Sequence, residues 1–433
     1  MFEKFLTKKI ELWLVLIILL LFFIGTILFG GLVRSYLIAG NRFGIVGEIA
    51  IFMSELPTKP AKVINNIFAS RYLSTQQKFK EFEKETFYFK KNERDDLGYI
   101  LISRYDSKSD TNIVELLDLN LQEIIYKWYN NSHDTIDHPL LLNDGSLIAK
   151  DYSSGNLIKI DKCSKQKILN KNTFLHHSTE LDADGNIWIP IRYHPNSETA
   201  KELGLDAVGF VDDGIAKLNL NGDLLYKKNI LEILIENNLG DIIFTSPPSH
   251  DPIHLNDIQP ALEDGKFWKK NDLFLSIKNQ SMIILYRPST NKILWFKKGP
   301  WSNQHDVDII DKSKISVFDN NISDKFNISE FSNYVVYDFE TESFEYPFSE
   351  SFKKFKIATL TGGLSETIND KEILIEESDF GRLIIVDKNS KPIWRYHNLN
   401  DKGESFILSW SRYIKKGSIY KTLKILKNSN CIN

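Results

Sequence analysis

Four histidines open similar segments of the chain, and such a set could do chemistry together. A neutral imidazole is a nucleophile, a general base or a metal ligand, and its unperturbed pKa of about 6.5 lets it change charge near neutral pH. Several imidazoles crowded at one place would be costly unless chemistry or a ligand used them. We therefore treat the four as candidates for one site: His138, His177, His254 and His305.

The neighbours of these histidines refine the expectation. His138 stands six residues before Asp144 and His305 six before Asp311, which predicts a shared register. His176 is adjacent to His177, and strand alternation lets only one of the two face the same side.

Two acidic residues lie within three positions after His305. Asp306 or Asp308 could orient the His305 imidazole. An ordinary role as a strand-end turn carboxylate is the equal alternative, because alternation along a strand would point one of them away.

The elements that must position these residues form a repeat. Each segment reads as an opening strand, a turn, an apolar strand, a second turn and further strands, one of which bears Trp or Tyr. About six copies fit a six-bladed β-propeller better than a β-sandwich, and residues at one register on successive blades would then form a ring at one mouth of the channel. The copies open at Gly98, His138, His177, His254, His305 and Gly362.

An uncharged run from Leu12 to Val33 predicts a membrane anchor. As a helix it would be roughly 33 Å long, enough to cross a bilayer core. A cleaved signal peptide would have a shorter apolar stretch and a small-residue cleavage site; a buried core helix is the other alternative. We expect a tail and anchor over 1–34, a juxtamembrane spacer or cap over 35–95 and the propeller over 96–433. A small excess of lysines before the run favours a cytoplasmic N-terminus and a body outside.

Composition limits the partners. The 433 residues are 42% hydrophobic, which is enough for a large core. A net charge of −3 gives no basic face of the kind that binds nucleic acid, so we expect no nucleic-acid partner. Two cysteines, Cys163 and Cys431, cannot be paired from the sequence alone.

Several longer stretches resemble the bacterial arylsulfotransferase family, over about His176 to Tyr396. The resemblance implies a six-bladed propeller that moves a sulfuryl group from one phenolic ester to another phenol, without a nucleotide sulfate donor or other cofactor, through a covalent sulfohistidine. The stretches that carry it are DPIHLNDIQPAL, DLFLSIKNQSMIILYRPSTNKILW, GPWSNQHDVDIIDKSKISVFDNN and TGGLSE.

The same resemblance implies roles for single residues. His305 corresponds to the nucleophile, and His254 and Asn256 correspond to a histidine and an asparagine of the family's site. Lys278 stands where characterised members have arginine, and lysine keeps the charge but loses the two-point fork. One of His176 and His177 would be a further channel histidine.

Neutral hydrogen bonds to a substrate could come from two amides beside Lys278. These are Asn279 and Gln280. Amides that satisfy the backbone of a turn are the equal alternative for both.

Three other interpretations remain open at this stage. Convergent imidazoles can bind a transition metal, although Lys278 would be an odd neighbour for a cation. The propeller could be a non-catalytic binding module of the cell envelope. The acceptor could be a glycan hydroxyl rather than a small phenol. Tryptophans could stack on either acceptor or pack between blades; they are Trp268, Trp295 and Trp301.

Overall fold

The structure is a computed structural model that describes residues 11–39, 43, 45–55, 87–89, 96–130, 135–152, 154–205, 209–244, 250–321, 331–429 and 431. The chain divides into two compact units. The first contains Met1–Arg71 and Glu198–Phe210, and the second contains Tyr72–Ser197 and Val211–Asn433.

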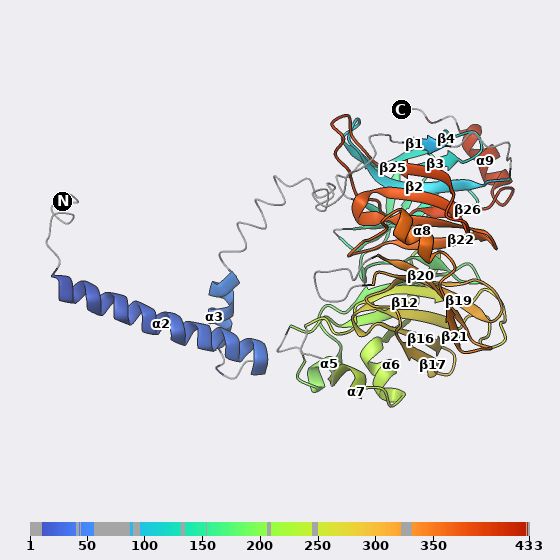
Figure 1. Cartoon of the computed structure of the whole chain (residues 1–433). Coiled ribbons are helices and arrows are strands. Elements are labelled where there is room, and N and C mark those ends of the chain that lie inside the picture. Colours follow the sequence, from blue (N-terminus) through green and yellow to red (C-terminus); the bar gives the residue numbers. More distant parts are fainter. Residues whose placement is uncertain are drawn as a thin grey trace. The chain divides into compact units, whose positions relative to one another are not determined.

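Helices make up the described part of the first unit: α2 (Leu12–Ala39), α3 (Ile45–Glu55) and the short α5 (Glu198–Glu202). The 24 residues Leu12–Ser35 of α2, blue in Figure 1, have a mean hydropathy of 3.1 and are not buried. Within the described ranges this is the one helix long and apolar enough to cross a membrane, and a signal sequence near the N-terminus would have the same properties.

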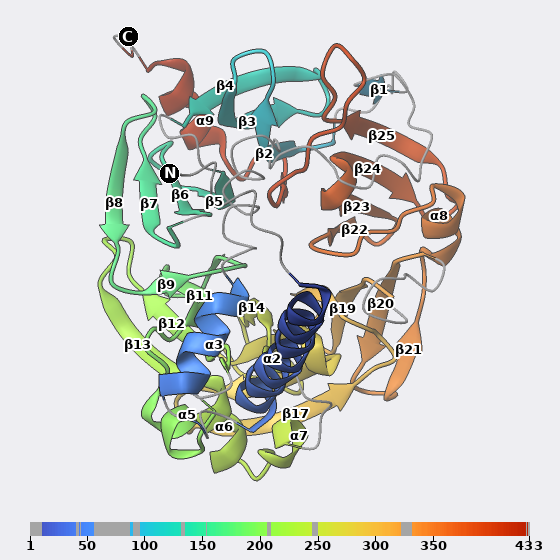
Figure 2. The ribbon, with the colours of Figure 1, turned by 90° about the vertical axis from the view of Figure 1, so that its left-hand side faces the viewer.

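The second unit is a ring of antiparallel sheets about one axis (Figure 2). The described residues form six such sheets, so the prediction of a six-bladed β-propeller is confirmed. From the centre outward, the strands of blades 1 to 3 are β26 (Arg412–Ile414), β2 (Tyr99–Asp106), β3 (Thr111–Asp118) and β4 (Glu123–Tyr129); β5 (Ile136–Leu141), β6 (Leu147–Asp151), β7 (Leu157–Ile160) and β8 (Gln166–Asn170); and β10 (Glu180–Leu181), β11 (Ile187–Arg192), β12 (Asp213–Leu218) and β13 (Leu224–Asn229).

Blades 4 to 6 follow the same order. Their strands are β14 (Leu255–Pro260), β15 (Leu273–Ile277), β16 (Met282–Arg287) and β17 (Lys292–Lys298); β18 (His305–Ile309), β19 (Lys314–Asp319), β20 (Asn333–Asp338) and β21 (Ser343–Glu345); and β22 (Leu364–Asn369), β23 (Glu372–Glu377), β24 (Arg382–Asp387) and β25 (Pro392–His397). The short β9 (Phe174–Leu175) pairs with β11, and β1 (Phe87–Phe89) pairs with β25 as the outermost strand of blade 6. Short helices lie between or after the blades: α6 (Ile230–Glu236), α7 (Asp241–Phe244), α8 (Ser349–Lys354) and α9 (Tyr420–Lys427).

The core lies between neighbouring blades, because alternating side chains put apolar residues on both faces of each inner strand. Blades 4 and 5 enclose one such cluster. Trp268 and Trp301 are buried in it and Trp295 packs against it, so these tryptophans serve blade packing.

The ring closes where residues far apart in sequence share a sheet. Strand β26 pairs with β2, with Tyr99 opposite Ile414. The chain after Phe406 therefore closes the propeller.

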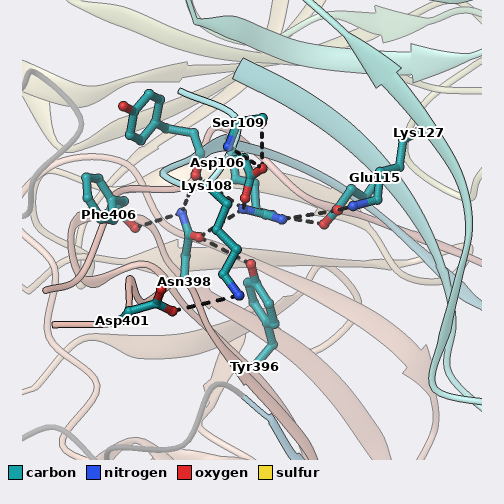
Figure 3. A network of polar contacts seen from close by, with 11 residues as sticks. Asp106, Lys108, Ser109, Glu115, Lys127, Tyr396, Asn398, Asp401 and Phe406 are labelled. Carbon is teal, nitrogen blue, oxygen red and sulfur yellow. Dashed lines mark hydrogen bonds and ion pairs between the residues drawn. The ribbon is translucent and has the colours of Figure 1, made fainter. Parts of the chain in front are cut away.

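A polar network joins the last blade to the first (Figure 3). Arg104 donates from Nε and Nη2 to the two oxygens of Glu115, at 2.9 and 3.1 Å. Asn398, which follows β25, donates from Nδ2 to the carbonyl oxygens of Tyr105 and Phe406 at 3.3 and 3.4 Å. The bonds that cross the seam between blade 6 and blade 1 join Asn398 to Tyr105 and to Arg104, whereas those from Arg104 to Glu115 lie within blade 1.

A disulfide between Cys163 and Cys431 ties the chain after α9 to blade 2 across 268 residues of sequence. A cross-link of this kind restricts the unfolded chain, which typically stabilises a fold by about 2–4 kcal/mol.

Candidate active site

Each blade places one residue with a left-handed backbone near the start of its inner strand. Three of these are His138, His177 and His254, with φ of 49°, 52° and 51°. Non-glycine residues rarely adopt this conformation, at a cost of about 1–3 kcal/mol, and such strain concentrates at functional sites. The other three positions are Asp306, Gly363 and Trp410.

His305 lies one residue before this common register, so the predicted register match between His138 and His305 is wrong. Asp306, with φ of 50°, takes the left-handed position in blade 5. The pairing of β18 with β19 shifts between His305 and Val307, whereas that of β5 with β6 shifts between Asp137 and Leu140. Because the pairing is irregular at a different point in each strand, counting residues along the sequence does not give the structural register.

The histidines nevertheless come together, and we call His138, His177, His254 and His305 the histidine ring. The ring centroids of His177 and His254 are 4.9 Å apart, and those of His177 and His305 are 6.5 Å apart. His138 stacks on Trp410 with centroids 4.3 Å apart. Burial, followed by the positive charges of Lys150 and Arg412, lowers the pKa of His138 well below its usual value.

His254 is held between an acid and a second imidazole. Its Nδ1 lies 2.6 Å from Oδ2 of Asp251, and its Nε2 lies 3.1 Å from Nε2 of His177. An ionised carboxylate only accepts hydrogen bonds, so the Nδ1 atom of His254 carries a hydrogen. Burial, followed by the nearby His176 and His254, lowers the pKa of His177 well below its usual value. A neutral His177 then shares one proton with His254 along the Nε2 contact.

Of the adjacent pair, His177 is the ring member. His176 lies behind it, with Nε2 3.2 Å from Oδ1 of Asp213. Burial lowers the pKa of His176 although Asp213 opposes the shift.

His305 is buried and its ring is held at both nitrogens. Its Nδ1 lies 2.7 Å from Oδ1 of Asn320, and the backbone N–H of Gly362 donates to its Nε2 at 3.3 Å. Asn320 therefore holds the position that the sequence offered to Asp306 or Asp308, and the Asp306 carboxylate instead accepts the N–H of Ser365. Burial, then the positive charge of Lys278, lowers the pKa of His305 to about 3.

Three cations stand at the ends of the second strands of successive blades. Lys150 in blade 2 lies 2.6 Å from Asp137 and donates to the carbonyl oxygen of His177 at 2.9 Å. Arg192 ends β11 in blade 3, and Lys278 follows β15 in blade 4. Burial lowers the pKa of Lys278. The positive charge of Lys278 acts on His305, so a cation lies near that imidazole.

Three amides were candidates for contacts with substrate. Asn256 is buried and donates to the carbonyl oxygen of Gln304 at 2.7 Å. Asn279 and Gln280 donate to the carbonyl oxygens of Asp251 and Pro252, at 2.6 and 2.7 Å. These last two amides fasten the loop that carries Asp251 to His254.

A second set of charged groups lies further along the inner strands. We call it the carboxylate tier, and its members are Glu180, Asp257, Asp308, Glu366 and Arg412. Arg412 donates to both oxygens of Glu180, at 3.1 and 2.8 Å.

Backbone amides of neighbouring blades bind the tier's carboxylates. The N–H of Val307 donates to Asp257 at 2.8 Å, and that of Tyr413 to Glu366 at 2.7 Å. Burial raises the pKa of Asp257 to about 7 and that of Glu366 to about 8. Burial also raises the pKa of Asp308 well above its usual value.

Among the described side chains, no group of three or more His, Cys, Asp or Glu is arranged to hold a metal ion.

Three residues of the site were missed from the sequence: Asp251, Asn320 and Arg192. Asp251 stands three residues before His254, a short-range signal that could have found it. Arg192 and Lys278 occupy matching strand ends, so an alignment of the repeats would have drawn attention to Arg192. Asn320 had no local signal beyond its place after β19, because the carbonyl oxygens that orient its amide, those of Thr359 and Gly362, lie on a distant turn.

The model of the family described as arylsulfotransferase (ASST) matches residues 138–399, more than half of the chain. No curated protein sequence matches the chain significantly.

Solved structures with a similar fold are distant. One is a protein of unknown function from Bacteroides caccae, with 11% identity, 73% of this chain and 98% of that chain covered, and a TM-score of 0.46. Another is selenomethionine-substituted virginiamycin B lyase from Staphylococcus aureus, with 11% identity, 76% and 88% covered, and a TM-score of 0.39.

Proposed function

Because the chain belongs to the arylsulfotransferase family, we propose that His305 carries a sulfuryl group from an aryl sulfate ester to an acceptor hydroxyl. The observation that supports this most is a buried imidazole, neutral because its pKa is about 3, beside the positive Lys278. A neutral nitrogen keeps the lone pair that nucleophilic catalysis needs. The acceptor is a phenol or a glycan hydroxyl.

The transfer takes two steps. In the first, the hydrogen bond from the Gly362 N–H to His305 Nε2 breaks, and the lone pair of Nε2 forms a bond to sulfur while the bond from sulfur to the aryl oxygen breaks. That oxygen keeps the electron pair and takes a proton from His254. In the second, the acceptor oxygen loses its proton and attacks sulfur, and the N–S bond breaks to restore the imidazole. Both steps keep the sulfur group aligned with the nucleophile.

The other residues of the site stabilise negative charge, transfer protons or position the reacting groups in this proposal. Lys278 binds the sulfuryl oxygens and stabilises the negative charge that they carry in the transition state. His254 exchanges a proton with the departing or arriving hydroxyl, and Asp251 orients its ring by accepting the hydrogen of Nδ1. His177 and Asn256 line the site, and His176 stands behind His177. Asn279 and Gln280 act through the loop they fasten.

We also propose that the propeller lies outside the cytoplasm, anchored by α2 with the N-terminus inside. The Cys163–Cys431 disulfide supports this placement, since disulfides persist in oxidising compartments. The uncharged length of α2 supports an anchor.

The test is intact-mass analysis of the protein after incubation with an activated aryl sulfate. We expect a sulfuryl adduct that peptide mapping places on His305, and its loss together with all turnover in His305→Ala. His250→Ala is the matched control, because His250 is an exposed histidine outside the ring. Turnover that survives in His305→Ala would contradict the proposal, as would a protein that is inert to aryl sulfates and loses a bound metal on this substitution.

A further inference from the structure

We propose that Asn320 is a positioning residue that fixes His305 in the tautomer with its hydrogen on Nδ1 and its lone pair on Nε2. The structural part of this inference concerns hydrogen bonds alone. Its catalytic consequence rests on the proposed function, in which Nε2 of His305 forms the bond to sulfur.

The side-chain amide of Asn320 can be oriented in only one way. Its Nδ2 lies 3.0 Å from the carbonyl oxygen of Thr359 and 2.9 Å from that of Gly362. Carbonyl oxygens are acceptors, so the NH₂ group must face them. The Oδ1 atom is thereby the one that lies 2.7 Å from Nδ1 of His305. An amide oxygen is an acceptor, and therefore Nδ1 carries the hydrogen.

The second ring nitrogen gives the same answer independently. The backbone N–H of Gly362 points to Nε2 of His305 at 3.3 Å. An N–H group can only donate, so Nε2 must offer its lone pair. A protonated ring would set two N–H groups against each other there, which agrees with the low pKa of this histidine.

The turn that supplies these partners is itself held in place. Asp379 accepts the N–H groups of Leu360 and Thr361, each at 2.9 Å, and the hydroxyl of Thr359 at 2.7 Å. Gly363 has φ of 94°, and a Cβ atom there would lie 2.5 Å from the Phe318 ring. The turn can therefore hold its carbonyl oxygens steady toward Asn320.

Fixing the tautomer matters because the two ring nitrogens are not equivalent in the site. Without Asn320 the Nδ1 atom loses its acceptor, and the turn that carries the Gly362 N–H loses its two bonds from the Asn320 amide. The neutral ring could then place its hydrogen on Nε2, and that nitrogen would have no lone pair for sulfur. A wrong tautomer lowers the rate of the chemical step and leaves the binding of substrate largely unchanged.

The tautomer can be measured without any substrate. Long-range ¹H–¹⁵N correlation spectra of the full chain in detergent, with ¹⁵N-labelled histidine, distinguish the two nitrogens, and His305→Ala assigns the signals. We expect the Nδ1–H form in the unaltered protein and a mixture of tautomers in Asn320→Ala. Asn333→Ala is the matched control, since Asn333 begins the neighbouring strand of the same blade. A dominant Nε2–H form in the unaltered protein would overturn the inference.

Kinetics supply the second readout. In Asn320→Ala the rate of adduct formation should fall about 10- to 100-fold, as for other residues that orient a reacting group, with little change in KM. Asn320→Asp keeps an acceptor for Nδ1, so it should retain the tautomer while its negative charge raises the pKa of His305 and moves the acid limb of the pH profile upward. An unchanged rate and tautomer in Asn320→Ala would refute the inference.

The two proposals fail separately in these experiments. If the expected tautomer is found but no aryl sulfate reacts, the proposed function is wrong and the role of Asn320 stands. If Asn320→Ala does not fold, the spectrum of the unaltered protein and the Asn320→Asp variant still decide the matter.

Discussion

In blades 3, 4 and 5 a histidine of the ring stands at or just before the inner strand that carries a carboxylate of the tier, yet the polar groups of the two regions have different partners. In the tier, Asp257 and Glu366 accept backbone N–H groups from the next blade, and Arg412 binds both oxygens of Glu180. In the ring, His177 and His254 face each other through their Nε2 atoms. The tier links blades, whereas the ring presents imidazoles to one another.

Burial acts on both regions in the same physical way with opposite chemical results. It favours the uncharged form of any group, so it lowers the pKa of His305 and raises that of Glu366. An uncharged imidazole gains its lone pair and becomes a nucleophile. An uncharged carboxyl loses its charge and becomes a neutral partner in packing. By removing charge, burial can therefore make one group reactive and let another pack stably.

The largest expected effect separates the two regions by activity. His254→Ala should slow turnover of an aryl sulfate about 100- to 1,000-fold, or ~2.7–4 kcal/mol, because it removes a fixed group that serves developing charge. Glu366→Gln in the tier keeps the acceptor for Tyr413 and should leave turnover within about threefold. Steady-state kinetics with one activated phenyl sulfate decides between them. Equal losses in both variants would abolish the distinction between ring and tier.

The next effect concerns stability against pH. Glu366 and Asp257 stay protonated in the folded protein up to about pH 8 and 7 and ionise near pH 4 when unfolded. The unfolded chain binds fewer protons in that window, so stability falls as pH rises through it. His305 acts in the opposite sense, since it is neutral when folded and protonated when unfolded below about pH 6.5.

Thermal denaturation in a pH series checks this sign. We expect a higher Tm at mildly acidic pH than at pH 8.5, and a smaller difference in Glu366→Gln. A Tm that rises steadily from acid to alkali would show that the tier is ionised in the folded protein.

The smallest effect tests the link between Lys278 and His305. The charge of Lys278 lowers the pKa of His305, so Lys278→Met should raise that pKa toward 6.5 and shift the acid limb of adduct formation to higher pH. Lys278→Arg keeps the charge and should keep the limb where it is. Rapid-quench measurements of the adduct across pH give the limb, and an unmoved limb in Lys278→Met would mean that burial alone sets the pKa.

Sequence patterns predict the repeated parts of this molecule well. Six similar segments indicate six blades, and histidines at the segment openings indicate a ring, because both signals are local and periodic. The one-residue offset of His305 could not be predicted, since it depends on where each strand pairing shifts. Nor could Asn320, whose partners lie on a turn some forty residues away, or the pairing of Cys163 with Cys431.

The closure of blade 1 has a consequence for the order of assembly. Because β26 pairs with β2, a ribosome must make nearly the whole propeller before the first sheet gains its innermost strand. Until then β2 presents an open edge of the kind that promotes aggregation. The same late segment carries Arg412, so Glu180 gains its cation only at the end of synthesis. The nascent protein is thus most prone to aggregation just before its synthesis is complete. The strand that removes the open edge also supplies the missing positive charge.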